Sequence, residues 1–343
     1  MRVAVLAGGR SSEHPVSLES ARSVLDGLET GGHDCRAIVI DREGIWRAED
    51  PRAGNGEAAN SVGRGEPVAL CPGQGIDGVD VVFPVLHGPF GEDGTVQGML
   101  ECIGIPYVGA GVLASALCMD KVAFKQLMAQ AGVPQVRYEA VKESEWSADR
   151  DAVADRARAL PLPRFVKPAR LGSSFGISKV SAEDELPDAL DAAFRHDPSV
   201  LIEAAAIGSE VECSVIGNGD PVASEPGEVI ANADWYDYEA KYTTGGMELV
   251  VPARISDAQR ERVRRLAVET FVASACTGMA RVDFFVTDQG QVLVNELNTI
   301  PGFTSTSVFA RLFEASGVPY VELLDKLLGY AVERYEAEQR YRH

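Results

Sequence analysis

Several features that define particular classes of protein are missing from this sequence of 343 residues. It contains no run of 18 or more apolar residues, so we expect no membrane-spanning helix. Its six cysteines form no CxxC pair and have no histidine at zinc spacing, which predicts free thiols and no structural zinc. Acidic residues outnumber basic ones by 51 to 32, and the net charge of −19 argues against nucleic acid as a partner.

Common nucleotide-binding and targeting signals are absent as well. No GxxxxGK[ST] sequence is present, so a P-loop is excluded, and the first glycine-rich turn lacks the GxGxxG of dinucleotide sites. The first apolar stretch has five residues, which is too short for a signal-peptide core, and no small-residue cleavage site follows it. We therefore expect a cytoplasmic protein that does not bind membranes.

The first third of the chain does contain an alternation of short apolar strands with helical spacing of apolar residues. The predicted strands cover residues 3–6, 35–40 and 79–86, and the predicted helices cover residues 16–28 and 95–103. This alternation is typical of a parallel α/β sheet, which binds ligands at the carboxyl ends of its strands. Residues 42–78 are rich in Gly, Ala, Glu and Pro and predict a surface excursion with a short hairpin at 45–47.

The remainder of the chain predicts mixed α/β and α+β structure in two further units. The predicted strands cover residues 136–141, 165–167, 177–180, 200–203, 210–216, 279–286 and 292–297. The predicted helices cover residues 121–131, 182–196, 257–276 and 319–340. We expect three domains, at residues 1–118, 119–207 and 208–343.

The clearest chemical pattern lies near the carboxyl end, on two predicted strands joined by the turn 288–290. Asp283 lies inside an apolar run, while Glu296 and Asn298 share one face of the next strand because they are two residues apart. Oxygen ligands on a rigid hairpin suit Mg²⁺, which shares the phosphates of a substrate. A carboxylate in a buried strand is costly unless it is paired or bound to metal, so this interpretation is preferred over a solvated hairpin with charged tips.

A glycine-rich loop at residues 172–176 follows the strand that contains Lys167. Small residues allow backbone N–H groups to approach phosphate oxygens, and Lys167 adds a positive charge. Because the loop lies between two strands, it predicts a flap over a nucleotide. The alternative is an ordinary Gly-Ser hairpin.

Other segments give weaker signals. Glu203 and Glu210 flank a connector and could accept hydrogen bonds from adenine and ribose, although surface acids are an equal alternative. Residues 235–246 hold four aromatic residues and a lysine without periodicity, which favours a mobile loop over a cleft or an aromatic loop packed on the surface. Glu13 and His87 follow the first and third strands, where Glu13 could hold an ammonium group and His87 is either functional or a core histidine.

These segments together resemble the D-alanine–D-alanine ligases of the ATP-grasp superfamily. The ordered motifs are AGGRSSEHPVS, HGPFGEDGTVQG, MDK, VKPARLGSSFGISKV, YDYEAKY, ARVDFF and NELNTIPGFTSTS, which span residues 1 to about 330. The resemblance implies an N-terminal parallel α/β (pre-ATP-grasp) domain followed by a two-lobed ATP-grasp fold that clamps ATP. It further implies ligation of two D-alanines through a D-alanyl phosphate, for peptidoglycan precursor synthesis, by a homodimer.

The resemblance also implies a role for individual residues. The residues implied in catalysis are Glu13, Ser173, Tyr242, Arg281 and Gly302. Those implied in binding D-alanine are Glu13, Ser17, His87, Arg281 and Ser307. Those implied in binding ATP are Lys121, Lys167, Ser173, Ser174, Glu203, Ala206, Glu210, Lys241 and Phe285. The implied ligands of two Mg²⁺ ions, or of Mn²⁺, are Asp283, Glu296 and Asn298.

Some positions depart from the family pattern, and three other functions are compatible with parts of it. Leu171 stands where some members have an acid, and residues 204–206 are alanines where some members have bulkier residues against adenine. The alternatives are an ester-forming ligase that uses D-lactate, another ATP-grasp ligase, and a nucleotide-binding regulatory protein without turnover. Tyr242 argues against the first, the first-domain motifs against the second, and the complete set of lysines and metal ligands against the third.

Overall fold

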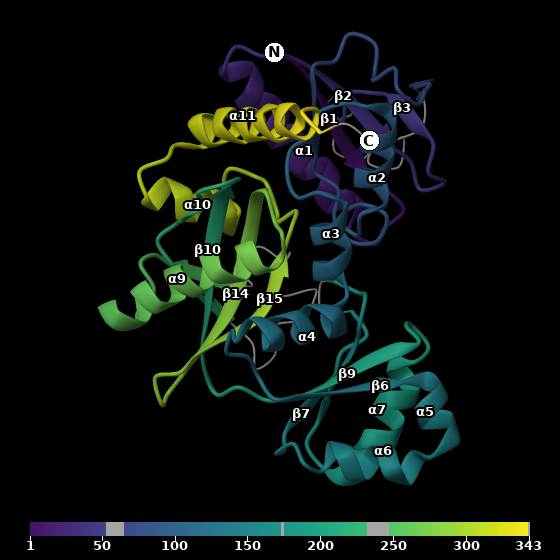
Figure 1. The fold of residues 1–343 in the computed structure, drawn as a ribbon, viewed down its shortest axis with the longest axis vertical. Coiled ribbons are helices and arrows are strands. Elements are labelled where there is room, and N and C mark those ends of the chain that lie inside the picture. Colours follow the sequence, from purple (N-terminus) through teal and green to yellow (C-terminus); the bar gives the residue numbers. More distant parts are fainter. Residues whose placement is uncertain (53–64, 173–174, 232–246, 342–343) are drawn as a thin grey trace.

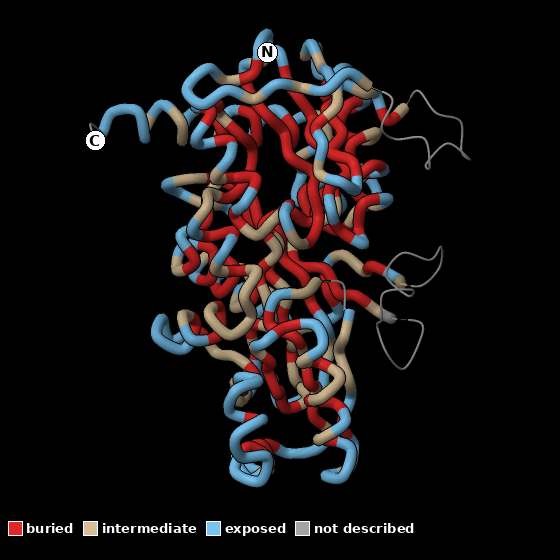
Figure 2. Tube along the Cα trace, turned by 90° about the vertical axis from the view of Figure 1, so that its right-hand side faces the viewer, coloured by how far each residue is buried: buried red, intermediate tan, exposed pale blue. Residues whose placement is uncertain are grey.

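The computed structural model describes residues 1–52, 65–172, 175–231 and 247–341. Three β-sheets with their helices follow one another along the long axis of the molecule (Figure 1). Buried residues run continuously through the upper and middle parts of the chain (Figure 2). No described helix is long and apolar enough to cross a membrane.

The first sheet has the strand order β4-β3-β2-β1-β5. Its strands are β1 (Arg2–Gly8), β2 (Asp34–Ile40), β3 (Trp46–Ala48), β4 (Glu66–Pro67) and β5 (Val81–Pro84). β1 pairs in parallel with β2 and β5, as the alternating pattern predicts. Helices α1 (His14–Thr30) and α2 (Thr95–Ile103) accompany these strands, and the middle of β1 is fully buried because both faces of the sheet are covered.

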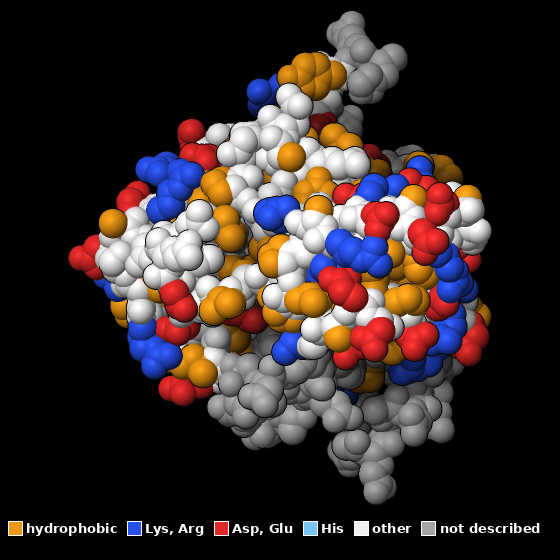
Figure 3. Space-filling view, turned by 90° about the horizontal axis from the view of Figure 1, so that it is seen from below, with side chains coloured by type: hydrophobic (Ala, Val, Ile, Leu, Met, Phe, Trp, Pro, Cys, Tyr) orange, Lys and Arg blue, Asp and Glu red, His pale blue; other side chains and the backbone are white. Residues whose placement is uncertain are grey.

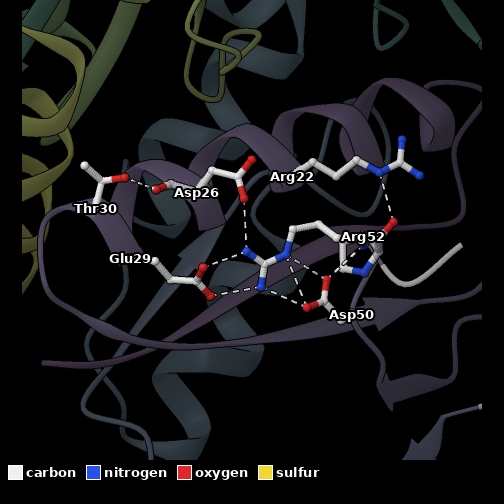
Figure 4. A network of polar contacts seen from close by, with 7 residues as sticks. Arg22, Asp26, Glu29, Thr30, Asp50 and Arg52 are labelled. Carbon is white, nitrogen blue, oxygen red and sulfur yellow. Dashed lines mark hydrogen bonds and ion pairs between the residues drawn. The ribbon is translucent and has the colours of Figure 1, made fainter. Parts of the chain in front are cut away.

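The predicted surface excursion at residues 42–78 adds an antiparallel edge to this sheet. β3 pairs with β2 and with β4, so the short hairpin expected near residues 45–47 is formed by β2 and β3. After β3, Arg52 is bound by the carboxylates of Asp26 and Glu29 on α1 and by Asp50 (Figure 4). The Arg52 network therefore fastens the excursion to the helix whose first turn lies beside Glu13.

The second sheet is antiparallel and has the order β6-β9-β7-β8. Its strands are β6 (Tyr138–Lys142), β7 (Arg164–Pro168), β8 (Ser178–Val180) and β9 (Ser199–Ala204). Helices α5 (Glu143–Ala148), α6 (Arg150–Ala157) and α7 (Leu186–Ala193) pack with Val166 and Ile202 in one core. Seen from below, acidic and basic side chains are interspersed over this end of the molecule, where pairs such as Arg150–Asp191 form (Figure 3).

The third sheet is also antiparallel and has the order β13-β12-β10-β14-β15, with β11 paired to β10. Its strands are β10 (Gly208–Gly217), β11 (Val222–Ala223), β12 (Gly227–Ala231), β13 (Met247–Val250), β14 (Gly278–Thr287) and β15 (Val292–Asn298). The helices around it are α3 (Val112–Met119), α4 (Lys121–Ala131), α9 (Asp257–Ala273) and α10 (Val308–Ala315). The sequence prediction included neither α3, α10, β12 nor β13.

The last helix, α11 (Tyr320–Glu338), returns to the first sheet (Figure 1). Its apolar side joins the core formed by α1, β1 and β5. Arg334 on this helix donates to the backbone oxygens of Tyr107 and Gly109 and to Thr277 Oγ1, at 2.5–3.1 Å. The first and third sheets are therefore tied together by the C-terminal helix.

Candidate active site

A cavity of about 920 Å³ lies where the three sheet units meet. The chain around the first sheet contributes Glu13, Ser20, His87 and Glu92, and the glycine-rich loop of the second unit contributes Gly172. The third sheet contributes Arg281, Glu296 and Asn298, and residues 299–302 and 304–307 complete the wall. Side chains that are distant in sequence are thus brought to one chamber.

Three carboxylate residues stand in a row across neighbouring strands of the third sheet. Asp283 on β14 is opposite Glu212 on β10 and opposite Glu296 on β15. The Arg281 guanidinium donates to both oxygens of Asp283 at 2.7 Å and lies 2.9 Å from Glu212 Oε2, and Asn298 Nδ2 donates to Asp283 Oδ2 at 3.0 Å. Burial disfavours the charged guanidinium, but Asp283 and Glu212 outweigh it and raise the pKa of Arg281.

This row of carboxylates contains the predicted metal ligands Asp283 and Glu296, and Asn298 lies beside it. Asp283, Glu296 and Asn298 supply oxygen donors that suit Mg²⁺. Within the described part of the chain, however, no three His, Cys, Asp or Glu side chains are grouped closely enough to hold an ion. Mg²⁺ is commonly held by one or two carboxylates together with substrate phosphates. The donors therefore fit a divalent ion that would arrive with a nucleotide and draw part of its ligand set from the phosphates.

Lys121 lies at the start of α4, after Asp120, whose carboxylate caps the helix by accepting from the N–H groups of Val122 and Ala123. Its Nζ donates to the backbone oxygen of Leu171 at 2.7 Å and lies 3.9 Å from Glu296 Oε2. Burial lowers the pKa of Lys121, although the nearby carboxylate of Glu296 acts in the opposite direction. Lys121 thus joins the glycine-rich loop to the row of carboxylates.

Glu203 on β9 is held by two lysines. Its Oε1 lies 2.5 Å from Lys125 Nζ, and its Oε2 forms an ion pair with Lys167 Nζ. Burial alone would raise the pKa of Glu203, but Lys167 and Lys125 lower it to about 2. Burial would lower the pKa of Lys167, but Glu203 raises it. Neither Glu203 nor Lys167 lines the cavity, so this cluster forms a separate part of the candidate site.

Glu13 lies between the loop that contains Gly88 and the glycine-rich loop that contains Gly172. A Cβ atom at Gly88 would come within 2.8 Å of Glu13 Oε2, and one at Gly172 within 3.4 Å. Gly88 also has a φ of 76°, a conformation that favours glycine, and a side chain there would displace the Glu13 carboxylate. Burial, followed by the charge of Glu13, raises the pKa of the neighbouring Glu92 carboxyl to about 8.

His87 connects α1 to residues 299–307, which we name the 299–307 loop. Burial lowers the pKa of His87, so its ring is neutral, and Nδ1 must donate to the Ile300 oxygen at 3.0 Å. Nε2 then accepts from Ser20 Oγ at 3.2 Å, and Ser20 Oγ accepts from the N–H of Phe303 at 3.3 Å. Ser23 Oγ accepts in the same way from the N–H of Ser305. Helix α1 therefore shapes the loop that contains Gly302.

The other predicted residues are placed as follows. Ser17 is fully buried and does not line the cavity. Its hydroxyl accepts from the N–H of Gly8 and donates to the Val85 oxygen, so Ser17 ties α1 to β1 and β5. Gly302 and Ser307 line the cavity, whereas the ATP residues Ala206, Glu210 and Phe285 do not. Phe285 is opposite Glu210 in the sheet. Ser173, Ser174, Lys241 and Tyr242 lie outside the described residues.

Sequence reasoning missed five polar residues of this site. They are Ser20, Ser23, Glu92, Lys125 and Glu212. Two of them carried a usable signal, because Lys125 is one helical turn after Lys121 within an apolar stretch and Glu212 shares a strand face with Glu210. The two serines and Glu92 become recognisable only when distant segments are brought together.

Two antiparallel sheets hold lysines and carboxylates between them, and the α/β domain beside them carries a buried acid. This arrangement defines an ATP-grasp enzyme, the class that joins a carboxylate to an amine using ATP. Comparisons with known proteins narrow this class. Residues 2–110 match the family described as "D-ala D-ala ligase N-terminus", and residues 127–329 match "D-ala D-ala ligase C-terminus". The chain belongs to the D-alanine–D-alanine ligase family.

Individual relatives agree with this assignment. The chain is 48% identical to the D-alanine–D-alanine ligase of Deinococcus radiodurans, covering 97% of this chain and 98% of that protein. It is 44% identical to the enzyme of Geobacillus thermodenitrificans, covering 98% and 97%. Among solved structures, it resembles the Coxiella burnetii D-alanine-D-alanine ligase (TM-score 0.89, 35% identity, 99% and 96% covered). It also resembles the VanG D-Ala:D-Ser ligase of Enterococcus faecalis (TM-score 0.85, 37% identity, 96% and 99% covered).

Proposed function

We propose how this ATP-dependent ligase joins two D-alanines into D-alanyl-D-alanine for peptidoglycan synthesis. The observation that carries the proposal is that Glu13, Arg281 and the 299–307 loop line the same cavity. We assign residues 1–118 to a substrate-binding domain, 119–207 to the central ATP-grasp lobe and 208–343 to the C-terminal lobe. The lobes hold the nucleotide, and the first domain presents the first D-alanine to it.

In the first step, a carboxylate oxygen of D-alanine attacks the γ-phosphorus of ATP, giving D-alanyl phosphate and ADP. Glu13 holds the ammonium group, and His87 lies beside the substrate. Lys121 and Lys167 hold the phosphates, because phosphoryl transfer depends on positioning and on charge neutralisation. Asp283, Glu296 and Asn298 would hold two Mg²⁺ ions, or Mn²⁺, and the bound ions would supply positive charge to neutralise the phosphates.

In the second step, the amine of another D-alanine attacks the acyl carbon, and phosphate leaves with the oxygen that it took from the carboxylate. Arg281 and the backbone N–H of Gly302 stabilise the tetrahedral oxyanion, where one donor is worth roughly 3–4 kcal/mol. Ser307 contacts the carboxylate of the second substrate. The position of Gly302 and Ser307 in the cavity wall supports both assignments.

The remaining assignments concern the nucleotide and the assembly. Glu203 accepts from the adenine amino group and Glu210 from the ribose hydroxyls, while Ala206 and Phe285 lie against the nucleotide. Ser173, Ser174, Lys241 and Tyr242 retain the roles that the family resemblance implies. We place the reaction in the cytoplasm, where ATP is available, and assign a homodimer by family resemblance, which light scattering of the purified protein tests.

Product analysis tests the reaction. Mg-ATP is supplied with D-alanine, L-alanine, D-alanine plus D-lactate, or D-alanine plus D-serine, and the product is identified by mass. We expect phosphate release with D-alanine alone and a D-Ala-D-Ala product. Preferred use of D-lactate or D-serine would overturn the choice of second substrate, and absence of phosphate release with every pair would indicate a regulatory protein.

An isotope experiment tests the intermediate. D-alanine labelled with ¹⁸O in its carboxylate should transfer one ¹⁸O atom to each phosphate released, because the acyl phosphate keeps that oxygen when its carbon–oxygen bond breaks. Unlabelled phosphate would exclude D-alanyl phosphate. The Glu13→Gln variant should retain Mg-ATP binding but show a higher KM for the first D-alanine.

A further inference from the structure

The second sheet presents two chemically different faces. Val166 and Ile202 belong to the core beneath helices α5–α7, and the alternation of strand residues directs Phe165, Lys167 and Glu203 to the opposite face. Helix α4 packs against this second face, where it brings Lys125 to Glu203. An ion cluster therefore occupies the face that the proposed function assigns to the nucleotide.

The two lysines of this cluster differ in what else they can reach. The Lys125 side chain is 2% exposed, its Nζ lies 5.7 Å from the centre of the Tyr138 ring, and its partner Glu203 is 4% exposed. The Lys167 side chain is 13% exposed and near the charge of Lys121, the other lysine assigned to the phosphates. Lys125 is enclosed behind Glu203, whereas Lys167 can exchange its partner for a bound anion.

We propose that Lys125 is a positioning residue for adenine selection: it keeps the Glu203 carboxylate in place through Oε1 while the ATP phosphates draw Lys167 away from Oε2. The vacated Oε2 then accepts from the 6-amino group of adenine. Recognition of the base is thereby coupled to binding of the phosphates. Lys167 occupies Glu203 Oε2, the acceptor for the adenine amino group, until a bound phosphate replaces Glu203 as its partner. This inference rests on the role proposed above for Glu203.

A buried charge without a partner is costly. If Lys167 were the only cation at Glu203, its transfer to phosphate would leave a buried carboxylate without a counter-ion, which is strongly unfavourable. Lys125 removes that penalty. It also fixes the orientation of the carboxylate, so that the second oxygen remains directed at the place that Lys167 leaves.

The test compares ATP with inosine triphosphate, which has an oxygen in place of the 6-amino group. The variants are Lys125→Met, Lys125→Arg and Glu203→Gln, and the control is Lys142→Met, which removes an exposed lysine of the same lobe. Dissociation constants are measured by calorimetry with Mg²⁺, and KM and kcat are measured for both nucleotides with D-alanine. Circular dichroism and thermal unfolding report whether each variant is folded.

We expect Lys125→Met to reduce the preference for ATP over inosine triphosphate by about tenfold, which corresponds to one hydrogen bond to a charged group. The KM for ATP should rise, while kcat at saturating ATP and the KM for D-alanine should change little. Lys125→Arg should restore most of the preference, and Lys142→Met should match the wild type. An equal loss with both nucleotides, or a fall in kcat alone, would overturn the inference.

The exchange of Lys167 has its own test, which uses nucleosides without phosphates. Adenosine and inosine should bind the wild type with nearly equal affinity, because Lys167 still occupies Oε2. Lys167→Met should increase the preference for adenosine, while Lys125→Met should not. A wild type that already prefers adenosine over inosine as strongly as ATP over inosine triphosphate would refute the coupling.

The Glu203→Gln variant separates this inference from the proposed function. If Glu203→Gln abolishes the nucleotide preference but Lys125→Met keeps it, only the role of Lys125 is wrong. If Glu203→Gln keeps the preference, the adenine role of Glu203 is wrong and the inference falls with it, while dipeptide synthesis remains established by the product assay. If Lys125→Met does not fold, Lys125→Gln is measured in its place with the same expected loss.

Discussion

Two arginines of this protein are each surrounded by carboxylates, yet their surroundings differ. Arg52 is 29% exposed, and its partners on the surface, Asp26, Glu29 and Asp50, are 42–69% exposed (Figure 4). Arg281 is 17% exposed, and its partners Asp283 and Glu212 are 14% and 11% exposed. Ion pairs exposed to water contribute little to stability. In a buried ion pair, removal of one partner leaves the other as a costly buried charge. Similar chemistry thus fastens a surface segment in one place and holds together part of the proposed active site in the other.

A third arrangement is buried like the Arg281 site but consists of uncharged groups. The 299–307 loop is positioned by neutral hydrogen bonds: His87 donates to the Ile300 oxygen, and Ser20 Oγ accepts from the N–H of Phe303. Such bonds fix the position of the loop without adding charge near the carboxylate of the substrate. The three arrangements therefore predict three sizes of effect when one member is removed.

The largest effect is expected for Arg281→Met. Loss of an oxyanion donor should lower kcat by about 10²–10³-fold. Asp283 and Glu212 would lose their buried guanidinium partner, which should also reduce stability, by roughly 3–5 kcal/mol. Steady-state kinetics and urea unfolding measure the two effects, and Arg265→Met, which removes an exposed arginine from α9, is the matched control. A variant with near-normal kcat would contradict the assigned role.

An intermediate effect is expected for Ser20→Ala. The buried Phe303 N–H and the His87 ring each lose a partner, so stability should fall by about 1–3 kcal/mol. Because the loop carries Gly302, kcat should fall about tenfold while the KM for ATP stays constant. In the control Ser23→Ala, the exposed Ser305 can donate to water and the effect should be smaller. Equal effects in both variants would refute a special role for the His87 connection.

The smallest effect is expected for Arg52→Met, with unchanged kcat and a loss of stability of about 1 kcal/mol or less at pH 7. Hydrogen bonds from Arg52 lower the pKa values of Glu29 and Asp50. Depressed carboxyl pKa values stabilise the fold above about pH 4 and lose that contribution as the pH falls through them. The difference between variant and wild type should therefore shrink below pH 4 in urea titrations. A difference that grows in acid would show that these ion pairs do not cause it.

The sequence predicted much of this fold because periodic apolar patterns and glycine turns are local. The parallel pairing of β1 with β2 and the opposition of Asp283 and Glu296 both follow from such patterns. Helices α3 and α10 were missed because short apolar segments do not distinguish helix from strand. The partners of Glu203 could not be predicted either, since Lys125 reaches it only through the packing of α4 on the second sheet, and Lys167 only through the pairing of β7 with β9.

The return of α11 to the first sheet separates the order of synthesis from the order of folding. Leu18 and Leu25 near the start of the chain share a core with Leu324 and Leu328 near its end. While the chain is synthesised, this apolar side of the first sheet stays uncovered until α11 has been made. A chain released early would expose that side to aggregation and proteolysis. The core of the first sheet, which forms from the earliest part of the chain, therefore stays incomplete until residues 320–338 are available to close it.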